Sequence, residues 1–539
     1  MSRLIGKLFV VVALSSGSLL AQWEAIDSSA IAKIREEGFK RSQVMEILSY
    51  LTDVNGPRLT GSTGHLKSTE WVRSKLKEWN LENPHLEAWG PWGKGWTLKK
   101  YSATVLMDQP WPLQSFPKAW SPGTNGTITA EVIYLEAKTD SALATYKGKL
   151  KNKIVMLSDP RSVEPYWTIR AIRESDSSLL RYANAEATPA DAPSSFVNPP
   201  APTEAQKIGL RLNWEKWKLI ESEGALAVMT TAFNDAGNMQ FVQAAGVPRD
   251  WDAPASEFKP AYRWDAPKIL PQIYVGIEHY QRLLRVMQKG LHPKVEMKMD
   301  VEIIRADSSF NVIAEIPGTD LKDEVVMIGA HLDSWHSATG ATDNATGVTT
   351  CMEAVRILQS LGLKPRRTIR IALWSGEEQG ELGSNAYIRQ HFAEIDSARG
   401  AIKHKPEAAK FSVYFNNDNG TGKVRGVFME GMENVRPIFR RWLEPFRDLG
   451  ASTLTLERTT STDHEPFVHV GLPGFQFIQD RIEYFTKSWH STQDLYERVL
   501  PEDLQQASVV MAAFAYNAAM RDGLFPRKIV KSAVSNGTH

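Results

Sequence analysis

The chain contains a single cysteine, Cys351, in 539 residues, so no disulfide can form within one molecule. Cys351 lies in an apolar stretch with helical spacing, which predicts a small buried residue rather than a reactive nucleophile. Hydrophobic residues make up 42% and charged residues 23% of the chain, as in ordinary globular proteins. A hydrophobic core must therefore hold the fold, and the length allows about two to four domains.

The chain also lacks an excess of charge of either sign. Its formal net charge is +1, and its basic residues form no concentrated stripe. No broad electrostatic field therefore attracts nucleic acid or an anionic membrane surface. We expect no nucleic-acid partner.

Long apolar runs are absent except at the N-terminus. Arg3 and Lys7 precede a mostly apolar stretch from Leu8 to Leu20, and Ala21 is followed by a cleavage site. This layout is typical of a secretory signal peptide over residues 1–21, and the stretch is shorter than the ~20 residues of a comfortable membrane span. We expect a secreted or periplasmic protein without a stable membrane span, anchored to the membrane only if the signal peptide stays uncleaved.

Helices and short strands alternate along most of the mature chain. Helical patterns cover 28–55 and 63–79, and short strands separated by helices and loops fill residues 123–283. From residue 308 the alternation becomes regular, with strands expected at 311–316, 324–330, 368–374, 411–415 and 474–478 and helices at 346–361, 383–392 and 504–520. The pattern predicts an α/β fold, a mixed and mostly parallel twisted sheet flanked by helices, with a smaller β-rich region inserted.

Residues that commonly bind metals follow the ends of these predicted strands. They are His331 and Asp333 after 324–330, Glu377 and Glu378 after 368–374, Asp418 after 411–415, His490 after 474–478, and Asp343 before helix 346–361. In an open α/β sheet the functional crevice lies at the carboxyl ends of the strands, so these side chains should converge. Each alone is more often an ordinary surface or core residue, but five such motifs in one topological position rarely arise by chance.

The types of these residues favour zinc. Imidazole nitrogen and carboxylate oxygen both bind zinc, and two histidines with several carboxylates and no cysteine suit a catalytic site better than a structural one. An odd number of carboxylates lets one of them bridge two ions, which can share a hydroxide and hold a substrate carbonyl. The sequence therefore predicts a two-metal hydrolytic centre.

Five segments of the chain carry a family resemblance. They are His331-Leu-Asp333, Gly340-Ala-Thr-Asp343-Asn344, Trp374-Ser-Gly-Glu377-Glu378-Gln-Gly380, Asn417-Asp418-Asn-Gly420 and His490-Ser-Thr-Gln-Asp494. In order and spacing they resemble the M28 zinc metallopeptidases, and within that family the branch that contains plasma glutamate carboxypeptidase. The resemblance covers nearly the whole mature chain and implies the zinc-exopeptidase fold, which is similar to that of phosphorylases and hydrolases.

The resemblance also implies a domain organisation. Residues 22–122 would form the N-terminal part of the peptidase domain, and residues 123–283 an inserted protease-associated domain. Residues 284–525 would complete the catalytic domain, followed by a C-terminal tail at 526–539. The resemblance also allows a homodimer.

The same resemblance assigns the metal ligands. His331 and Asp418 would bind one zinc ion, Glu378 and His490 would bind a second, and Asp343 would bridge both. Asn344 stands where close relatives often have a second aspartate, which changes one local charge and removes no ligand.

Further roles follow from the family pattern. Glu377 would be the general base that takes a proton from the bridging water and passes it to the leaving amine. Asp333 would orient His331, and Asp494 would orient His490, as carboxylate–histidine–metal relays. The peptide bond after Asp343 would be cis.

The residues that contact the substrate are less fixed by the sequence. Trp335 and Tyr484 lie near the ligands and would form an apolar wall or simply pack. His464 belongs to a segment, 462–467, that is similar to aminopeptidases of the family rather than to the carboxypeptidase branch, and would polarise the scissile carbonyl or be structural. The sequence thus leaves aminopeptidase, dipeptidase and carboxypeptidase open.

The prediction is an exported di-zinc exopeptidase that hydrolyses short peptides or dipeptides through a metal-bridging hydroxide, with Glu377 as general base. One alternative is an aminoacyl transferase that resembles the glutaminyl cyclases, which use one zinc ion and lack the full ligand set. Another is a catalytically silent binding ectodomain, which needs neither the base nor five ligands. The intact set in this chain favours the peptidase.

Overall fold

The computed structural model describes residues 24–187, 202–232, 239–396 and 401–528. The predicted signal peptide lies outside this part of the chain, as does the predicted tail from residue 529 onward. Within the described residues, no helix combines the length and the apolar character that crossing a membrane requires.

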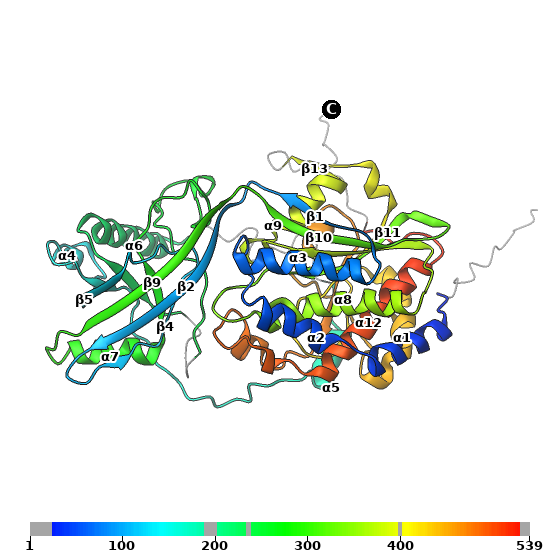
Figure 1. The fold of residues 1–539 in the computed structure, drawn as a ribbon, viewed down its shortest axis with the longest axis horizontal. Coiled ribbons are helices and arrows are strands. Elements are labelled where there is room, and N and C mark those ends of the chain that lie inside the picture. The colour runs from blue at the N-terminus through cyan, green and yellow to red at the C-terminus, as the bar shows by residue number, and fades with distance from the viewer. Residues whose placement is uncertain (1–23, 188–201, 233–238, 397–400, 529–539) are drawn as a thin grey trace, which may run out of the picture.

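The chain forms two lobes, each built on an eight-stranded sheet (Figure 1). The sheet of the main lobe contains, in spatial order, β1 (Glu82–Trp89), β10 (Ser309–Ile316), β12 (Arg367–Trp374), β11 (Leu321–His331), β15 (Phe411–Asn416), β18 (Gly474–Gln479), β16 (Val424–Phe428) and β17 (Thr453–Thr455). The sheet of the second lobe contains β3 (Trp111–Pro112), β2 (Gly93–Leu106), β9 (Lys294–Ala306), β5 (Thr127–Tyr134), β6 (Ile154–Met156), β7 (Ala227–Thr230), β8 (Gln272–Val275) and β4 (Ser115–Pro117).

The main sheet is mixed. Strand β11 pairs in parallel with β12 and β15, and β15 pairs in parallel with β18. Strands β10 and β16 join this parallel centre in the antiparallel direction. The predicted class, a mixed twisted sheet flanked by helices, is confirmed.

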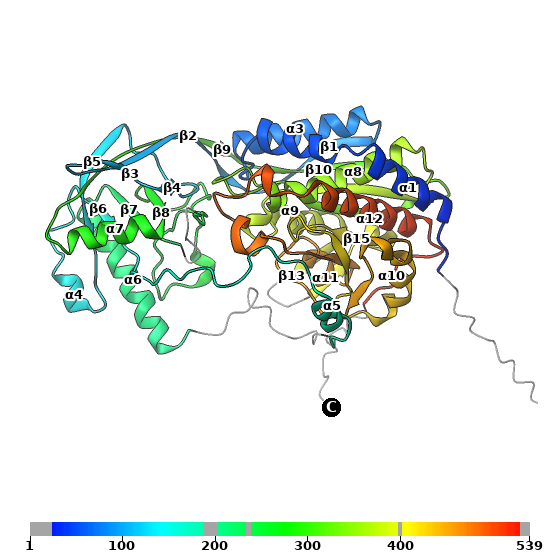
Figure 2. The same ribbon diagram turned by 90° about the horizontal axis from the view of Figure 1, so that it is seen from below.

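Helices cover both faces of the main sheet (Figure 2). One face carries α1 (Ser28–Lys40), α2 (Val44–Ser49), α3 (Thr63–Glu78), α8 (Thr346–Ser360) and α12 (Pro501–Met520). The same face also carries α10 (Arg436–Leu443), which packs near α12 and β17. The other face carries α9 (Leu382–Tyr387) and α11 (Glu465–His469). A short hairpin, β13 (Ala393–Asp396) and β14 (Ala401–His404), lies outside both sheets.

The alternation of side chains along each strand produces two cores. In β12, Ile371 and Leu373 point to the core under α8 and α12, whereas Ala372 and Trp374 belong to the core under α9 and α11. This follows from the two-residue period of a strand, which sends successive side chains to opposite faces. Because both faces are covered, the strands read as nearly continuous apolar runs.

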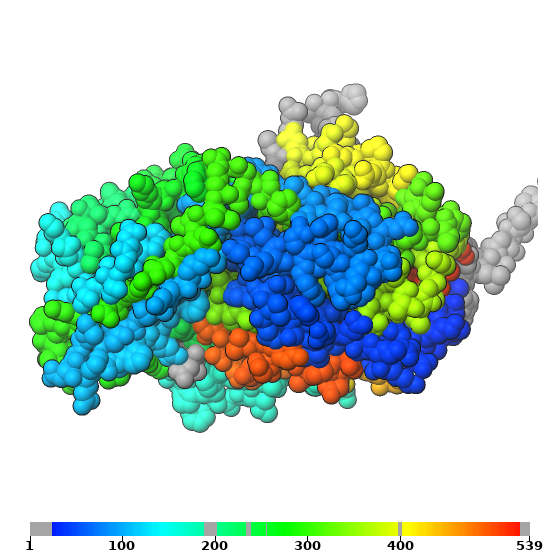
Figure 3. Space-filling view, in the orientation of Figure 1, coloured from blue at the N-terminus to red at the C-terminus, as the bar shows by residue number. Residues whose placement is uncertain are grey.

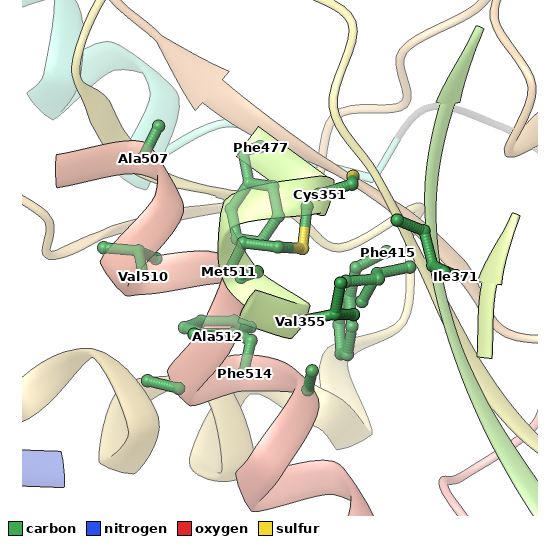
Figure 4. Packing of buried hydrophobic residues seen from close by; sticks show 14 of the residues in the cluster. Cys351, Val355, Ile371, Phe415, Phe477, Ala507, Val510, Met511, Ala512 and Phe514 are labelled. Carbon is green, nitrogen blue, oxygen red and sulfur yellow. The ribbon is translucent and has the colours of Figure 1, made fainter. Parts of the chain in front are cut away.

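The larger core lies between α8, α12 and the sheet (Figure 4). The ring of Phe514 on α12 has its centroid 5.5 Å from that of Phe415 and 5.2 Å from that of Phe477, both in edge-to-face contact. Cys351 is fully buried in the same cluster, as its sequence context predicts. This core fixes α8 against the strands that precede the predicted ligands.

The predicted helix at 28–55 is two helices rather than one. Asp27 accepts a hydrogen bond from Ala30 N at the start of α1, and α1 ends at Lys40 because Arg41 leaves the helical conformation. After this break Gln43 N donates to the Glu353 carboxylate of α8, 3.1 Å away. That tertiary hydrogen bond explains the break, which the apolar periodicity of the segment does not reveal.

The second lobe has three further helices, α4 (Asp140–Ala144), α6 (Glu204–Ser222) and α7 (Ile277–Met287). Its sheet extends beyond the predicted insert at 123–283, because β2 and β9 form a long antiparallel ribbon with partners from Gly93–Ala306 to Leu106–Lys294. In Figure 1 this ribbon runs from the second lobe to the edge of the main lobe. The identification of this region as protease-associated stays a prediction.

One segment of the second lobe crosses back to the main lobe. After β6 the chain crosses to the main lobe, where α5 (Asp176–Ala183) lies (Figure 2) and packs beside β17. Arg173 donates to the buried carboxylates of Asp480 and Asp503, each at 2.8 Å, and Ile172 pairs with Ile482 in an antiparallel bridge. The surface of the two lobes is therefore continuous (Figure 3).

We expect a Phe514→Ala substitution to lower the free energy of unfolding by about 3–5 kcal/mol, because it leaves a cavity among rings that cannot all collapse onto it. Urea denaturation followed by tryptophan fluorescence measures the change. Ile208→Ala is the control, since Ile208 is 59% exposed on α6 and its loss should change stability by less than about 0.5 kcal/mol. Equal stabilities of the two variants would contradict this account of the core.

Candidate metal centre

The topology of the main sheet brings the predicted ligands to one edge. His331 is the last residue of β11, Glu377 and Glu378 follow β12, and Asp418 follows β15. These three strands are parallel neighbours, so their carboxyl ends meet at the same edge. His490 arrives on the long loop after β18, which is parallel to β15. Asp343 lies immediately before α8, and the core described above holds that helix in place.

Asp343 lies between the two histidines. Its Oδ1 is 3.2 Å from His331 Nε2, and its Oδ2 is 3.2 Å from His490 Nε2. On one side, Asp418 Oδ1 is 3.3 Å from the same nitrogen of His331. On the other side, Glu378 Oε2 is 3.0 Å from the same nitrogen of His490. The five side chains thus form two half-sites, each with one histidine and one carboxylate, which share Asp343.

These distances fit zinc. Ligand atoms about 2.0–2.1 Å from a tetrahedral zinc ion lie roughly 3.3 Å from each other. The four nitrogen–oxygen distances, from 3.0 to 3.3 Å, match that spacing in both half-sites. Among the described residues, His331, Asp343 and Glu378 also form a group whose ligand atoms all lie within 4.8 Å of one another. The residues present can hold a metal ion without rearrangement.

The proton positions lead to the same conclusion. The Nδ1 of His331 lies 3.0 Å from the carbonyl oxygen of Asp333, which only accepts hydrogen bonds, so Nδ1 carries the proton. In the neutral ring, Nε2 then presents a lone pair to two carboxylate oxygens. Asp343 Oδ2, Glu378 Oε1 and Asp418 Oδ1 are buried, and no hydrogen bond to a described residue satisfies them. Acceptors that face acceptors in a buried site indicate a place for a cation.

The pKa values of the cluster also show the effect of its buried carboxylates. Burial alone would lower the pKa of His331, yet the carboxylates of Asp418 and Glu377 raise it well above its usual value. Burial likewise opposes charge on His490, but Glu378 and Asp343 raise its pKa to about 10. Burial raises the pKa of Glu378 to about 7. The carboxylates thus stabilise positive charge on both histidines.

Glu377 stands beside the half-site of His331. Its Oε2 is 3.9 Å from His331 Nε2, so it approaches the centre without completing the ligand spacing. Burial raises the pKa of Glu377 well above its usual range, against the pull of His331 and with a contribution from Asp418 and Asp463. A carboxylate with raised basicity at this position can accept and return a proton.

Asp333 supports the centre differently from the predicted relay. Its carboxylate oxygen is 3.8 Å from His331 Nδ1, too far for a hydrogen bond, and its main-chain carbonyl takes that place. The carboxylate instead accepts hydrogen bonds from the Thr60 hydroxyl at 2.9 Å and from the backbone N–H groups of Glu377 and Glu378 at 3.3 and 3.4 Å. Asp333 therefore shapes the loop that carries the base, and its predicted relay to His331 stays a prediction.

Asp494 also binds the backbone near a ligand, and its predicted relay to His490 stays a prediction. Its carboxylate accepts hydrogen bonds from the backbone N–H groups of Thr342 and Asp343, at 2.6 and 3.1 Å. Its carboxylate thereby holds the chain at Asp343. The peptide bond between Asp343 and Asn344 is cis, as the family resemblance implies.

Arg58 is a structural partner of the site that sequence reasoning missed. It is fully buried, and its guanidinium donates to the carbonyl oxygens of Leu332 at 2.7 Å, Thr339 at 2.7 Å and Gly340 at 2.9 Å. Burial lowers its pKa to about 10, and the carboxylate cluster, Asp494 first, opposes that shift. The sequence signal that could have indicated this role is the position of Arg58 in the turn sequence Gly56-Pro-Arg-Leu-Thr-Gly61.

The three residues considered for substrate contact lie in different surroundings. The Trp335 ring packs edge-on against the ring of His490, with centroids 6.0 Å apart. Tyr484 is 5% exposed and packs against Gly420, next to the loop of Asp418. His464 is fully buried, with Nε2 3.4 Å from Glu430, and both of its predicted roles stay predictions. A small open pocket borders Trp335, Asp343, Glu378 and His490.

The second lobe contributes one polar contact that sequence reasoning missed. The side-chain Nε2 of Gln243 lies 3.0 Å from Nδ1 of His490, the position predicted for Asp494. Nothing in the local sequence marks this glutamine, which is 247 residues away along the chain.

The chain is similar to known proteins in sequence and in fold. Residues 311–515 match the model of peptidase family M28. Carboxypeptidase Q from Mus musculus is 26% identical over 509 residues, which cover 94% of this chain and 92% of that protein. The fold is similar to that of a peptidase M28 precursor from Shewanella amazonensis SB2B, with a TM-score of 0.62 and 21% identity over 93% of this chain and 98% of that one. It is also similar to a zinc aminopeptidase from Bacillus subtilis, with a TM-score of 0.52 and 18% identity over 88% and 94% of the two chains.

The mixed sheet, the cluster of histidines and carboxylates at its edge and these similarities identify a metallopeptidase. More specifically, the part of the chain that resembles peptidase family M28, residues 311–515, contains all five of the predicted ligands.

We expect Arg58→Met to lower the free energy of unfolding of the metal-free protein by about 3–5 kcal/mol, because it removes a buried cation from a carboxylate cluster. Urea denaturation in the presence of a chelator measures the loss. The control is Arg73→Met, which removes an exposed ion pair with Glu70 on α3 and should cost less than about 1 kcal/mol. A loss at Arg58 no larger than at Arg73 would show that the cluster does not need this cation.

Proposed function

We propose that the protein is an exported exopeptidase that hydrolyses short peptides or dipeptides at a centre of two zinc ions. The observation that carries the proposal is the placement of Asp343, which directs one carboxylate oxygen to each histidine at 3.2 Å. A single ion would need only one of these contacts. The complete ligand set supports hydrolysis over the cyclase and binding alternatives.

Five residues would hold the ions. His331 and Asp418 belong to one half-site, Glu378 and His490 to the other, and Asp343 to both. Zinc, when bound, supplies a Lewis acid for the substrate carbonyl and lowers the pKa of water so that it can attack at neutral pH. The carboxylates of Asp333 and Asp494 hold the two loops that present these ligands.

Glu377 is the proposed proton carrier. Its carboxylate takes a proton from the attacking water and gives it to the leaving amine, which lets one group serve both halves of the hydrolysis. Its position, 3.9 Å from His331 Nε2, places it beside the reacting atoms without using it as a ligand. The backbone N–H of Glu377 is held by Asp333, so its side chain starts from a fixed point.

A small pocket opens at the centre, with Trp335 and Gly340 among the residues at its wall. The relatives include a protein named carboxypeptidase and a zinc aminopeptidase, so both peptide ends are candidates. The predicted homodimer stays a prediction.

A panel of dipeptides, with free or blocked ends, tests the proposed activity with and without a chelator and added zinc. We expect cleavage that the chelator abolishes and zinc restores. Cleavage only of peptides with a free amine identifies an aminopeptidase or dipeptidase, and cleavage of N-blocked peptides identifies a carboxypeptidase. If the protein bound two equivalents of zinc and cleaved no peptide in the panel, the proposal would be wrong.

Glu377→Gln should lower kcat by about 10²–10⁴-fold, because the amide cannot accept the proton, while zinc stoichiometry stays at two. Steady-state kinetics and metal analysis of the purified variant give the two values. Asp323→Asn is a matched control, a carboxylate in β11 but far from His331 at the other end of the strand, and should leave both unchanged. Near-normal turnover of the Glu377 variant would remove its role as base.

Asp343→Asn should weaken the binding of both ions together. The amide offers an oxygen ligand to only one half-site, and both half-sites lose the negative charge of the shared carboxylate. Titration of the metal-free protein with zinc, followed by calorimetry, measures the two affinities. Asp418→Asn is the comparison, and should weaken chiefly one of them. An Asp343 variant with one unchanged site would contradict the shared arrangement.

A further inference from the structure

The second lobe touches the loop that carries His490. Val242 N donates to the carbonyl oxygen of His490 at 2.9 Å, and Thr492 N donates to the carbonyl oxygen of Gln240 at 2.9 Å. Phe241 and Ser491 form an antiparallel bridge between these two hydrogen bonds. Residues 240–242 thus act as a short strand against 490–492, the segment that presents a predicted ligand.

This short strand is fixed within the second lobe. Ala119 N donates to the carbonyl oxygen of Gln243 at 3.0 Å, and Ala245 N donates back to that of Ala119 at 2.8 Å. Gln272 in β8 then clamps Gly246, with its side-chain amide accepting from Gly246 N at 2.9 Å and donating to Gly246 O at 2.7 Å. The position of residue 243 is therefore set by the sheet of the second lobe.

The ring of His490 has apolar neighbours on its faces and one polar neighbour at Nδ1. Trp489 stacks on the ring with centroids 3.9 Å apart, and Phe241 lies at 5.5 Å. The side-chain amide of Gln243 is the contact at Nδ1, at 3.0 Å. The backbone at His490 is left-handed, with φ of 52°, so its local conformation alone does not favour this orientation.

We propose that Gln243 is a positioning residue that holds His490 in its metal-binding orientation, so that the second lobe completes one half of the metal centre. The inference rests on the proposed two-zinc site. For Nε2 to bind a metal, Nδ1 must carry the proton and donate it, and the amide oxygen of Gln243 must accept. The structure places the amide nitrogen Nε2 of Gln243 against Nδ1, and a half-turn of the amide brings its oxygen to the same position.

The physical gain is twofold. An accepting oxygen at Nδ1 fixes the tautomer with its lone pair on Nε2, and it also fixes the rotation of the ring toward Glu378. Gln243 resembles in this respect the carbonyl oxygen of Asp333, which lies against Nδ1 of His331. Each histidine of the centre then has its own acceptor, one from the main lobe and one from the second lobe.

Titration of the metal-free protein with Co²⁺, followed by visible absorption, tests this role in Gln243→Met. Loss of the acceptor should weaken one of the two cobalt sites about 10–100-fold and change the absorption bands of that site, while the other keeps its affinity. Gln243→Glu, which restores an accepting oxygen, should recover most of the affinity. Gln288→Met is the control, since Gln288 is an exposed glutamine directly after α7 in the second lobe, outside the strand that pairs with the His490 loop.

The possible outcomes separate this inference from the proposed function. Wild-type protein that binds a single equivalent of cobalt overturns the two-metal centre itself. Two equivalents in the wild type, with unchanged affinities and absorption bands in Gln243→Met, overturn only the role of Gln243. Equal losses in the Met and Glu variants overturn it as well, because they assign the effect to packing rather than to the accepting oxygen.

Discussion

The concentration of buried carboxylates at one edge of the main sheet is the constraint on which the rest of the structure depends. Negative charge of this density is unfavourable in a buried site unless donors or cations answer it. Three kinds of group in the chain compensate this negative charge: the two histidines, the buried guanidinium of Arg58, and the backbone N–H groups that donate to Asp333 and Asp494. A set of buried acceptor atoms around Asp343 still has no hydrogen-bond donor among the described residues, and these atoms surround the place for a metal ion.

Much of this arrangement could be predicted from the sequence because it depends on topology. Residues that directly follow parallel strands must meet at one edge, so His331, Glu378 and Asp418 were placed together by chain order alone. The same holds for the two cores, since the side-chain alternation of a strand follows from its period. The break in the predicted helix at 28–55 was missed because its cause, a hydrogen bond to Glu353, lies far away in the chain.

The support around the ligands could not be predicted in the same way. Whether Asp333 reaches a histidine with its carboxylate or with its carbonyl depends on loop torsions that no spacing records. Asp494 likewise accepts from the backbone at Asp343 rather than from His490. The contact of Gln243 with His490 requires the docking of two lobes, which a single sequence does not reveal.

The segment that returns from the second lobe to the main lobe has a consequence for how the chain can be divided. Arg173 reaches two buried carboxylates of the main lobe, and residues 240–242 extend the backbone pairing of the ligand loop. Together with the β2–β9 ribbon, these contacts connect the two lobes at several separate places. The second lobe therefore cannot be removed without loss of contacts in the main lobe. A shorter relative without it would need other residues to support the loop of His490 and other partners for Asp480 and Asp503.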